Sequence, residues 1–188
     1  MTRTERMPML ARDAMDAAQR AAADELIAGP RGGVKGPFVA LLRSPELMSR
    51  LQKVGEYLRF QSALPPRLSE LVMATVAREW SNEFEWAVHV PLAQKAGVAA
   101  KILEAIGAGR RPDAMADDEA LVHDFTLELL ARKGVCDATY ERGVKSLGER
   151  ALLDLIGLIG YFVGICMVMN VAHTPGPAGS PPLGTFPP

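Results

Sequence analysis

The sequence predicts an all-α fold, and three observations support this prediction. Apolar side chains recur at helical spacing in several segments of the 188-residue chain. Start and stop signals bound those segments, such as Ser44-Pro45 before one and Pro65-Pro66 before the next. The alanine-rich stretch 11–28 has high intrinsic helix propensity and ends at Gly29-Pro30. We therefore expect helices packed around one core, because a chain of this length is sufficient for a single domain.

The chain divides into three parts by composition. Residues 1–28 are expected to form a loose arm and a helix, without the apolar core of a secretory signal. Residues 29–173 are expected to form the helical domain. Residues 174–188 are a Pro/Gly-rich tail that cannot build a core. It is expected to be either disordered or an extended arm on a partner subunit, with Leu183 and Phe186 as the only anchors for such an arm. Within the domain, helices are predicted at these ranges: 45–61, 67–80, 82–97, 98–106, 117–133, 137–147 and 149–173.

Composition excludes several functional classes. The net charge is −1 and basic residues are scattered without interleaved aromatics, so no nucleic-acid partner is expected. Cys136 and Cys166 lie too far apart in the sequence for a metal or redox motif, and we expect no cofactor and no metal. Such cysteine usage is typical of the reducing cytoplasm. The loop 29–37 is rich in glycine and carries Arg31 and Lys35, but it lacks the Gly-Lys-Ser/Thr ending of a phosphate loop. We expect it to line the mouth of the site described next.

The stretch 67–97 is predicted to form a helical hairpin that carries the candidate site. On its second helix Asn82, Glu85, Trp86 and His89 share one face, because they are spaced by three, four and seven residues. On its first helix Glu70 lies among apolar side chains, which would raise the pKa of its carboxyl toward the range useful for proton transfer.

Each of these residues also has a structural alternative. Glu70 follows Pro65-Pro66 in the first helical turn, where a carboxylate favours the helix N-terminus and can pair with Arg67. Glu85 stands three residues after Asn82, which is the spacing of a capping box. A histidine on a helix face, as at position 89, is often only a hydrogen-bonded core residue. The combination of two carboxylates and an imidazole in one hairpin favours catalysis. His123, in the helix 117–133, has Glu119 four residues before it and is interpreted as a surface residue.

These residues resemble the carboxymuconolactone decarboxylase family, which includes the alkylhydroperoxidase D-like proteins. The resemblance rests on Glu70-Leu71-Val72, on the run Glu85-Trp86-Ala87-Val88-His89, and on the helix 102–106, and it extends from about residue 29 to residue 173. It implies an alkylhydroperoxidase D-like helical bundle that forms trimers or hexamers. The peroxidase branch carries a Cys-x-x-Cys pair at the start of the second helix. Asn82 and Glu85 stand at those positions here, and neither side chain can act as a redox thiol. The resemblance is therefore to the branch without cysteines.

The segment 149–173 is a candidate second copy of the hairpin. Aligned without gaps, it places Asp154 at the position of Glu70 and His173 at that of His89, so we predict an internally repeated helical hairpin, with chance similarity of apolar helices as the alternative. The same segment is long and apolar enough to raise a membrane span, but its glycines and the polar Asp154 and Asn170 favour a buried helix. A helix that is apolar all round implies subunit contacts, so we expect a homo-oligomer without membrane or nucleic acid.

The resemblance thus implies a cofactor-independent lyase that acts on a small carboxylated or lactone substrate by acid–base chemistry. Glu70 and His89 are expected to share the proton transfer, with Glu85 orienting or protonating His89. Substrate binding is assigned to Asn82, Trp86, Arg78 and Tyr161, with Arg43 as a further candidate for a substrate carboxylate. The alternatives are a peroxidase-type antioxidant protein, which would need Cys136 or Cys166, and a non-catalytic ligand-binding oligomer.

Overall fold

The structure is a computed structural model of the whole chain, and it describes residues 4–181, 183 and 184. All regular elements among these residues are helical, which confirms the predicted fold class. A 3₁₀ turn at Arg12–Ala14 precedes the α-helices. The α-helices are α1 Ala17–Ala28, α2 Pro37–Leu41, α3 Pro45–Phe60, α4 Pro66–Glu79, α5 Glu83–Lys95, α6 Ala100–Gly107, α7 Asp117–Arg132 and α8 Asp137–Ala172.

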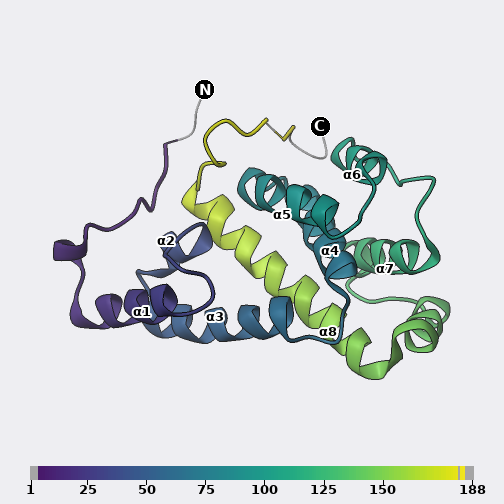
Figure 1. Cartoon of the computed structure of the whole chain (residues 1–188), viewed down its shortest axis with the longest axis horizontal. Helices are drawn as coiled ribbons and strands as arrows, with labels where there is room; N and C mark the ends of the chain where they lie inside the picture. The colour runs from purple at the N-terminus through teal and green to yellow at the C-terminus, as the bar shows by residue number, and fades with distance from the viewer. Residues whose placement is uncertain (1–3, 182, 185–188) are drawn as a thin grey trace.

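The long helix α8 organises the molecule (Figure 1). It crosses the centre of the fold, with α1, α2 and α3 on one side and α4, α5, α6 and α7 on the other. Two apolar clusters follow this division. One joins α4, α6 and α7 to the middle of α8, and the other joins α1, α2 and α3 to its C-terminal end. Tyr161 of α8 packs against both clusters, so the boundary between them passes through that side chain.

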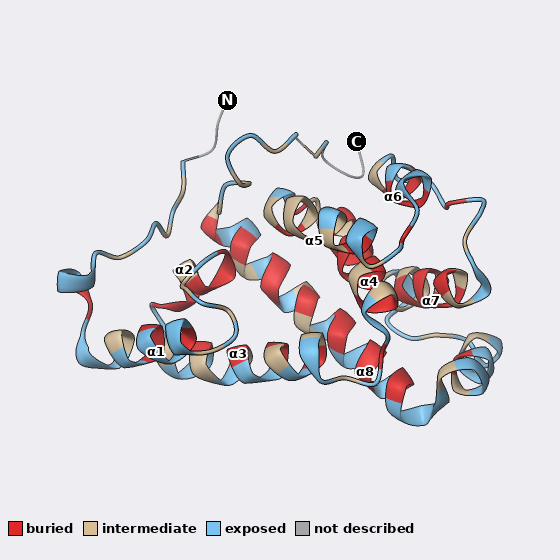
Figure 2. Cartoon of the chain, in the orientation of Figure 1, coloured by how far each residue is buried: buried red, intermediate tan, exposed pale blue. Residues whose placement is uncertain are grey.

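Most residues of helix α4 are buried (Figure 2). Every residue from Leu71 to Arg78 is buried, because α5, α7 and α8 all pack against this helix. Pro66 occupies its first turn, where the missing N–H costs nothing, so the helix begins one residue before the predicted start at residue 67. The antiparallel neighbour α5 completes the expected hairpin, so the acidic and imidazole side chains of the candidate site are attached to a rigid core helix.

Helix α8 corrects the predicted repeat. It bends at Gly148, whose φ of 77° interrupts the helical backbone, but residues 149–172 then form one uninterrupted helix and not a second hairpin. Asp154 and His173 therefore lie at opposite ends of it, about 28 Å apart at 1.5 Å per residue. Asp154 instead accepts hydrogen bonds from the Tyr57 hydroxyl (3.0 Å) and the Ala63 amide (2.8 Å), so it joins α8 to the end of α3.

By length and composition alone α8 could cross a membrane, and half of its most apolar window is buried inside the protein. Its outward face is also apolar, and this exposed stripe combines large side chains with glycines. The members of the stripe are Leu153, Ile156, Gly157, Gly160, Gly164, Met167 and Val171. Packing within this bundle covers the inner face of that window, and the outer stripe has no cover in the described chain.

The first and last described segments both contact the region where α8 ends and α5 begins. The amide of Arg6 donates to the carbonyl of Ala172 (2.8 Å), which ties the N-terminal arm to the end of α8. In the tail, Gly176 packs against Glu83 at the start of α5, and the guanidinium of Arg78 donates to the carbonyl of Gly184. The tail thus lies on its own chain over these residues. Phe186, one of the two anchors suggested for the tail, lies outside the described residues.

Candidate acid–base site

The turn between α4 and α5 is held by a polar network that sets the register of the site. Asn82 caps α5 by accepting a hydrogen bond from the amide of Glu85 (2.9 Å). Its own amide group donates to Asn170 of α8 (2.9 Å), and Asn170 donates to the carbonyl of Trp80 (2.8 Å). The cap and the turn are therefore anchored to α8. The Glu85 side chain does not return to the Asn82 amide, which donates to Ala77, so the capping-box alternative for Glu85 is wrong.

His89 lies between two carboxylates. Its Nδ1 is 2.6 Å from Glu70 Oε2 on α4, and its Nε2 is 3.1 Å from Glu85 Oε2 one turn earlier on α5. The His89 residue is 1% exposed and Glu85 is 5% exposed. The edge of Phe162 meets the imidazole face, with ring centroids 5.0 Å apart. Arg67, the alternative partner of Glu70, instead pairs with Asp118 and Glu119 on α7. The expected convergence of the three ionisable groups is thus present.

The two carboxylates determine the charge on the imidazole. Burial disfavours the imidazolium, but the hydrogen bonds and charges of Glu70 and Glu85 outweigh burial and raise the pKa of His89 above its usual value. In the charged form both ring nitrogens are donors, so each can donate to one carboxylate. The triad then carries one positive and two negative charges, and its proton can move between His89 and Glu85.

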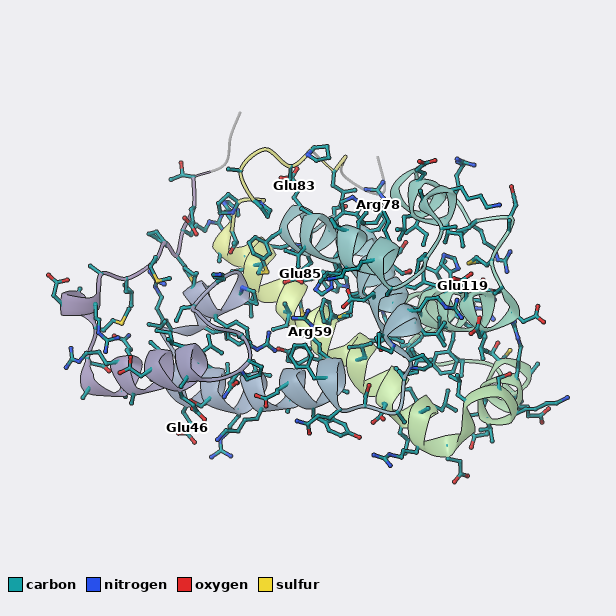
Figure 3. All side chains as sticks on the ribbon, viewed as in Figure 1. Glu46, Arg59, Arg78, Glu83, Glu85 and Glu119 are labelled. Carbon is teal, nitrogen blue, oxygen red and sulfur yellow. The ribbon has the colours of Figure 1, made fainter. Side chains whose placement is uncertain are left out.

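A cavity of about 340 Å³ opens beside this triad. Figure 3 labels two of its lining residues, Glu85 on α5 and Arg59 on α3, which come from opposite sides of the space in front of α8. The loop before α2, the start of α2, and α8 supply the remaining walls. The lining residues are Pro30, Arg31, Gly33, Lys35, Pro37, Phe38, Arg59, Phe60, Phe84, Glu85, Val88, His89, Tyr161, Phe162 and Ile165. The volume lies within the range of small-molecule sites, and most of the wall is aromatic or aliphatic.

The carboxylate that lines the cavity is Glu85, whereas Glu70 was expected to share the proton transfer with His89. Glu85 and His89 line the cavity, whereas Glu70 is absent from its wall and approaches His89 from behind. Glu85 is therefore the carboxyl group that a bound molecule can touch. Glu70 is placed to hold the Nδ1–H of His89 and to stabilise the imidazolium, which is a positioning task.

Three of the four residues expected to bind substrate lie elsewhere. Asn82 is used by the cap and by Asn170. Trp86 shares the helix face of His89, but its ring packs against Gly107, where a Cβ would lie 2.9 Å from the indole. Arg78 reaches the tail at Gly184. None of these lines the cavity, because a helix face is wide enough for neighbouring side chains to point to different partners. Tyr161 does line it.

Neither arginine expected to bind a substrate carboxylate, Arg43 or Arg78, lines this cavity. Arg43 donates to the carbonyls of Val39 and Pro8, away from the cavity. The arginines in the cavity wall are Arg31, from the glycine-rich loop, and Arg59, near the end of α3. The expectation that this loop lines the mouth of the site is confirmed. In the sequence, the one feature that places Arg59 near this cavity is its spacing of four residues from Gly55, which puts both residues on one face of α3.

Neither cysteine is part of the cavity wall. Cys136 is exposed just before α8, and Cys166 is buried in the core. Burial, with a smaller contribution from the charge of Glu85, raises the pKa of the Cys166 thiol far above its usual value, which disfavours the reactive thiolate. Among the described residues, no group of three or more His, Cys, Asp and Glu side chains is arranged to hold a metal ion.

Comparison with known proteins places this geometry in context. Residues 45–121 match the model of the carboxymuconolactone decarboxylase family. Among solved structures, the chain resembles the alkylhydroperoxidase AhpD core of an uncharacterized peroxidase-related protein from Ralstonia eutropha JMP134. The TM-score is 0.75 at 14% sequence identity, and the match covers 92% of each chain. No curated protein matches the sequence. The structural likeness establishes the fold, and the family match covers α3 to the start of α7, including the whole hairpin.

Proposed function

Residues 45–121 match the model of the carboxymuconolactone decarboxylase family, and from this match we propose that the chain is a cofactor-independent lyase acting on a small carboxylated or lactone substrate. The observation that carries the proposal is the buried Glu70–His89–Glu85 triad at the wall of a cavity of about 340 Å³. Such a triad supplies a proton to a carbon atom in a site from which bulk water is largely excluded.

The chemistry follows from the placement of these groups. In a carboxylated lactone or keto acid, the bond between the carboxylate and its neighbouring carbon breaks, and carbon dioxide leaves. The electron pair of that bond passes into the adjacent carbonyl system as an enolate or dienolate. A proton from the His89–Glu85 pair then adds to carbon, and solvent later restores the proton of the pair. Glu70 keeps the imidazole oriented and favours its charged form before the proton is transferred.

The test is carbon dioxide release from a panel of small lactone and keto acids, with Glu85→Gln and a matched control. Glu83→Gln makes the same change two residues earlier on α5, at an exposed position outside the cavity. We expect Glu85→Gln to lower kcat by about 10² to 10⁴, the usual contribution of a positioned acid or base, and Glu83→Gln to retain turnover. A panel on which wild type releases no carbon dioxide, or turnover that survives both Glu85→Gln and His89→Gln, contradicts the proposal.

The second candidate is a peroxidase-type protein, and the similarity of the fold to the peroxidase-related protein from Ralstonia eutropha favours it. In this chain a peroxidase would depend on Cys136 or Cys166, since Asn82 and Glu85 occupy the hairpin positions. Titration of both thiols against an alkyl hydroperoxide separates the candidates. Consumption of peroxide with loss of either thiol supports the peroxidase, and unchanged thiols remove it. A purely ligand-binding protein is indicated if wild type and triad variants behave alike on the acid panel.

We also propose that the chain forms a homo-oligomer. The exposed apolar stripe of α8 supports this, because a row of apolar side chains and glycines on a long helix favours close approach of another helix. Substitution of Met167, which is 46% exposed, by Glu is expected to lower the molecular mass observed by light scattering. An unchanged mass would show that this stripe is not the subunit contact.

A further inference from the structure

The cavity wall combines three cationic side chains with a single carboxylate. Arg31, Lys35 and Arg59 line the cavity, and Glu85 is the only acidic residue among the described residues that do so. Glu85 already interacts with His89 (3.1 Å), so its charge is partly used inside the triad. The cavity therefore has an excess of positive charge at the end away from the triad's own ion pairs. This excess has no evident use in holding the fold together.

The two guanidinium groups have hydrogen-bonding capacity that the described chain leaves unused. The buried Nε and Nη2 of Arg31 and the buried Nε of Arg59 have no hydrogen-bond acceptor among the described residues. A buried donor without a partner typically costs about 1–3 kcal/mol. The carbon Cζ of Arg31 lies 4.6 Å from the Phe38 ring centroid, and that of Arg59 lies 5.2 Å from the Phe60 centroid. These rings hold the cations in place without supplying acceptor atoms.

The packing of α3 leaves space for this arrangement at Gly55. A Cβ at this position would lie 2.2 Å from the Tyr161 hydroxyl oxygen and 2.7 Å from Arg31 Nη2, so both groups converge over the glycine. Arg59 follows one turn later on α3. Burial raises the pKa of the Tyr161 phenol, against the opposing charges of Arg31 and Arg59, so the phenol is protonated at neutral pH and can donate. The three hydrogen-bond donors are thus Arg31 from the loop, Arg59 from α3 and Tyr161 from α8.

We propose that Arg31 and Arg59 form a binding site for a carboxylate group of the ligand, with the Tyr161 hydroxyl as a third donor. Planar guanidinium groups match the two oxygens of a carboxylate, and such charge-assisted hydrogen bonds are strong. The ligand is then a small organic acid with an apolar body against Phe38, Phe84 and Phe162. This inference rests on the proposed function for its reaction, but the binding site stands on its own geometry.

The proposed reaction constrains which carboxylate is held here. Ion pairs with two arginines stabilise a carboxylate, whereas loss of carbon dioxide requires its negative charge to move onto carbon. A group held by Arg31 and Arg59 is therefore retained through the reaction, and its product keeps the same anchor. Simple acids that have no leaving group should consequently bind as competitive ligands. Neutral molecules of the same shape, alkyl hydroperoxides included, should bind poorly.

The test measures binding of 4-fluorophenylacetate and its neutral amide by ¹⁹F NMR. We expect wild type to bind the acid at least about tenfold more tightly than the amide. Arg31→Gln and Arg59→Gln should each weaken acid binding by about 10- to 100-fold, as expected for lost hydrogen bonds to a charged group, and should leave amide binding unchanged. Arg50→Gln is the matched control, because Arg50 lies on the same helix but is exposed and paired with Glu46. It should change neither affinity.

Further variants separate this inference from folding defects and from the proposed reaction. Arg59→Lys keeps the charge and should retain part of the affinity for the acid. His89→Gln should lose turnover but still bind the acid, so a failure of the lyase proposal leaves the binding result intact. Equal binding of acid and amide, no acid binding up to about 10 mM, or an effect of Arg50→Gln equal to that of Arg59→Gln would overturn the carboxylate site. Tighter binding of the matching phosphonate would overturn the assignment to a carboxylate.

Discussion

His89 on α5 and His123 on α7 are equally buried, at 1% and 2% exposure, yet their surroundings differ. His89 contacts two carboxylates from two helices and lines a cavity. His123 has one near carboxylate, Asp124 at 3.3 Å, which is itself held by Arg111 through two hydrogen bonds of 2.8 Å. It lines no part of the acid–base cavity. The interpretation of His123 as a surface residue is wrong, because α7 turns that side chain inward.

The two environments shift the imidazole pKa in opposite directions. At His123, burial lowers the pKa, and the attraction of Asp124 does not compensate because Arg111 neutralises that carboxylate. At His89, burial also lowers the pKa, but the hydrogen bonds and charges of two carboxylates raise it by more. Burial of a histidine is therefore not by itself a sign of function. A second carboxylate and an open cavity together distinguish the candidate proton donor from a packing residue.

The largest effect is expected when the same substitution is made at each of the two histidines and the variants are compared. His89→Gln should lower kcat for carbon dioxide release by about 10² to 10⁴, because it removes the proton donor. His123→Gln should leave kcat within about twofold, since its ring does not reach the cavity. Steady-state kinetics on any substrate found in the acid panel measures both. Similar losses of kcat in the two variants would mean that turnover depends on a buried histidine in general and not on the carboxylate pair around His89.

The next effect concerns the neighbouring carboxylates. Glu70→Gln keeps an acceptor for His89 Nδ1 but removes its charge, so the pKa of His89 should fall and kcat should drop by up to about a hundredfold. Because Glu70 does not line the cavity, KM should stay nearly constant. Asp124→Asn, the matched change beside His123, should alter neither parameter. A rise in KM with constant kcat for Glu70→Gln would indicate that Glu70 contacts the substrate.

A smaller effect appears in the pH dependence of stability. The pKa of His123 is lowered in the folded protein from its usual 6.5, so its contribution to stability is present above 6.5 and is lost as the pH falls through the folded value. Acidification should therefore destabilise wild type relative to His123→Gln, by about 1.4 kcal/mol for each unit of the shift. His89, with a raised pKa, contributes in the opposite sense, fully below 6.5. Urea unfolding across about pH 5 to 7.5 measures the difference. A gap between the two proteins that stays constant with pH would refute the burial of a neutral His123.

The smallest effect is expected at the ion pair over His123. Arg111 and Asp124 are 55% and 33% exposed, and water screens such pairs. Arg111→Gln should change the free energy of unfolding by no more than about 0.5 kcal/mol. Turnover should be unaffected. Thermal unfolding and carbon dioxide release check both points, and a loss of activity here would connect α7 to the site in a way that its position does not explain.

Helical spacing predicted that Glu70, Glu85 and His89 meet, and the structure confirms these contacts. Glu85 and His89 are one turn apart on α5, and the Asn82 cap determines where that helix begins. The contact of Glu70 with His89 could be predicted by assuming that the two helices pack antiparallel. The capping and phase of each helix are properties of a few adjacent residues, so sequence reasoning can reach them.

The cavity wall could not be predicted in the same way. Arg31 and Arg59 meet Tyr161 only because three segments far apart in the sequence converge at Gly55. The repeated hairpin failed for a related reason. Residues 149–172 contain the spacing of an acid and a histidine found in the hairpin, but no equivalent of the Ser81-Asn82 turn interrupts them, so the helix continues. Side-chain spacing is informative only after the turns have been placed.

The most direct test of the account is an NMR titration of the histidine rings in isotopically labelled protein. The chain has three histidines, so His123→Gln and His173→Gln variants assign the signals. The account predicts that His89 titrates above pH 6.5, with both ring nitrogens protonated below its pKa, and that Glu70→Gln shifts its titration to lower pH. A His89 ring that is neutral at pH 6.5 in wild type, or one whose titration is unchanged in Glu70→Gln, would contradict the charged triad.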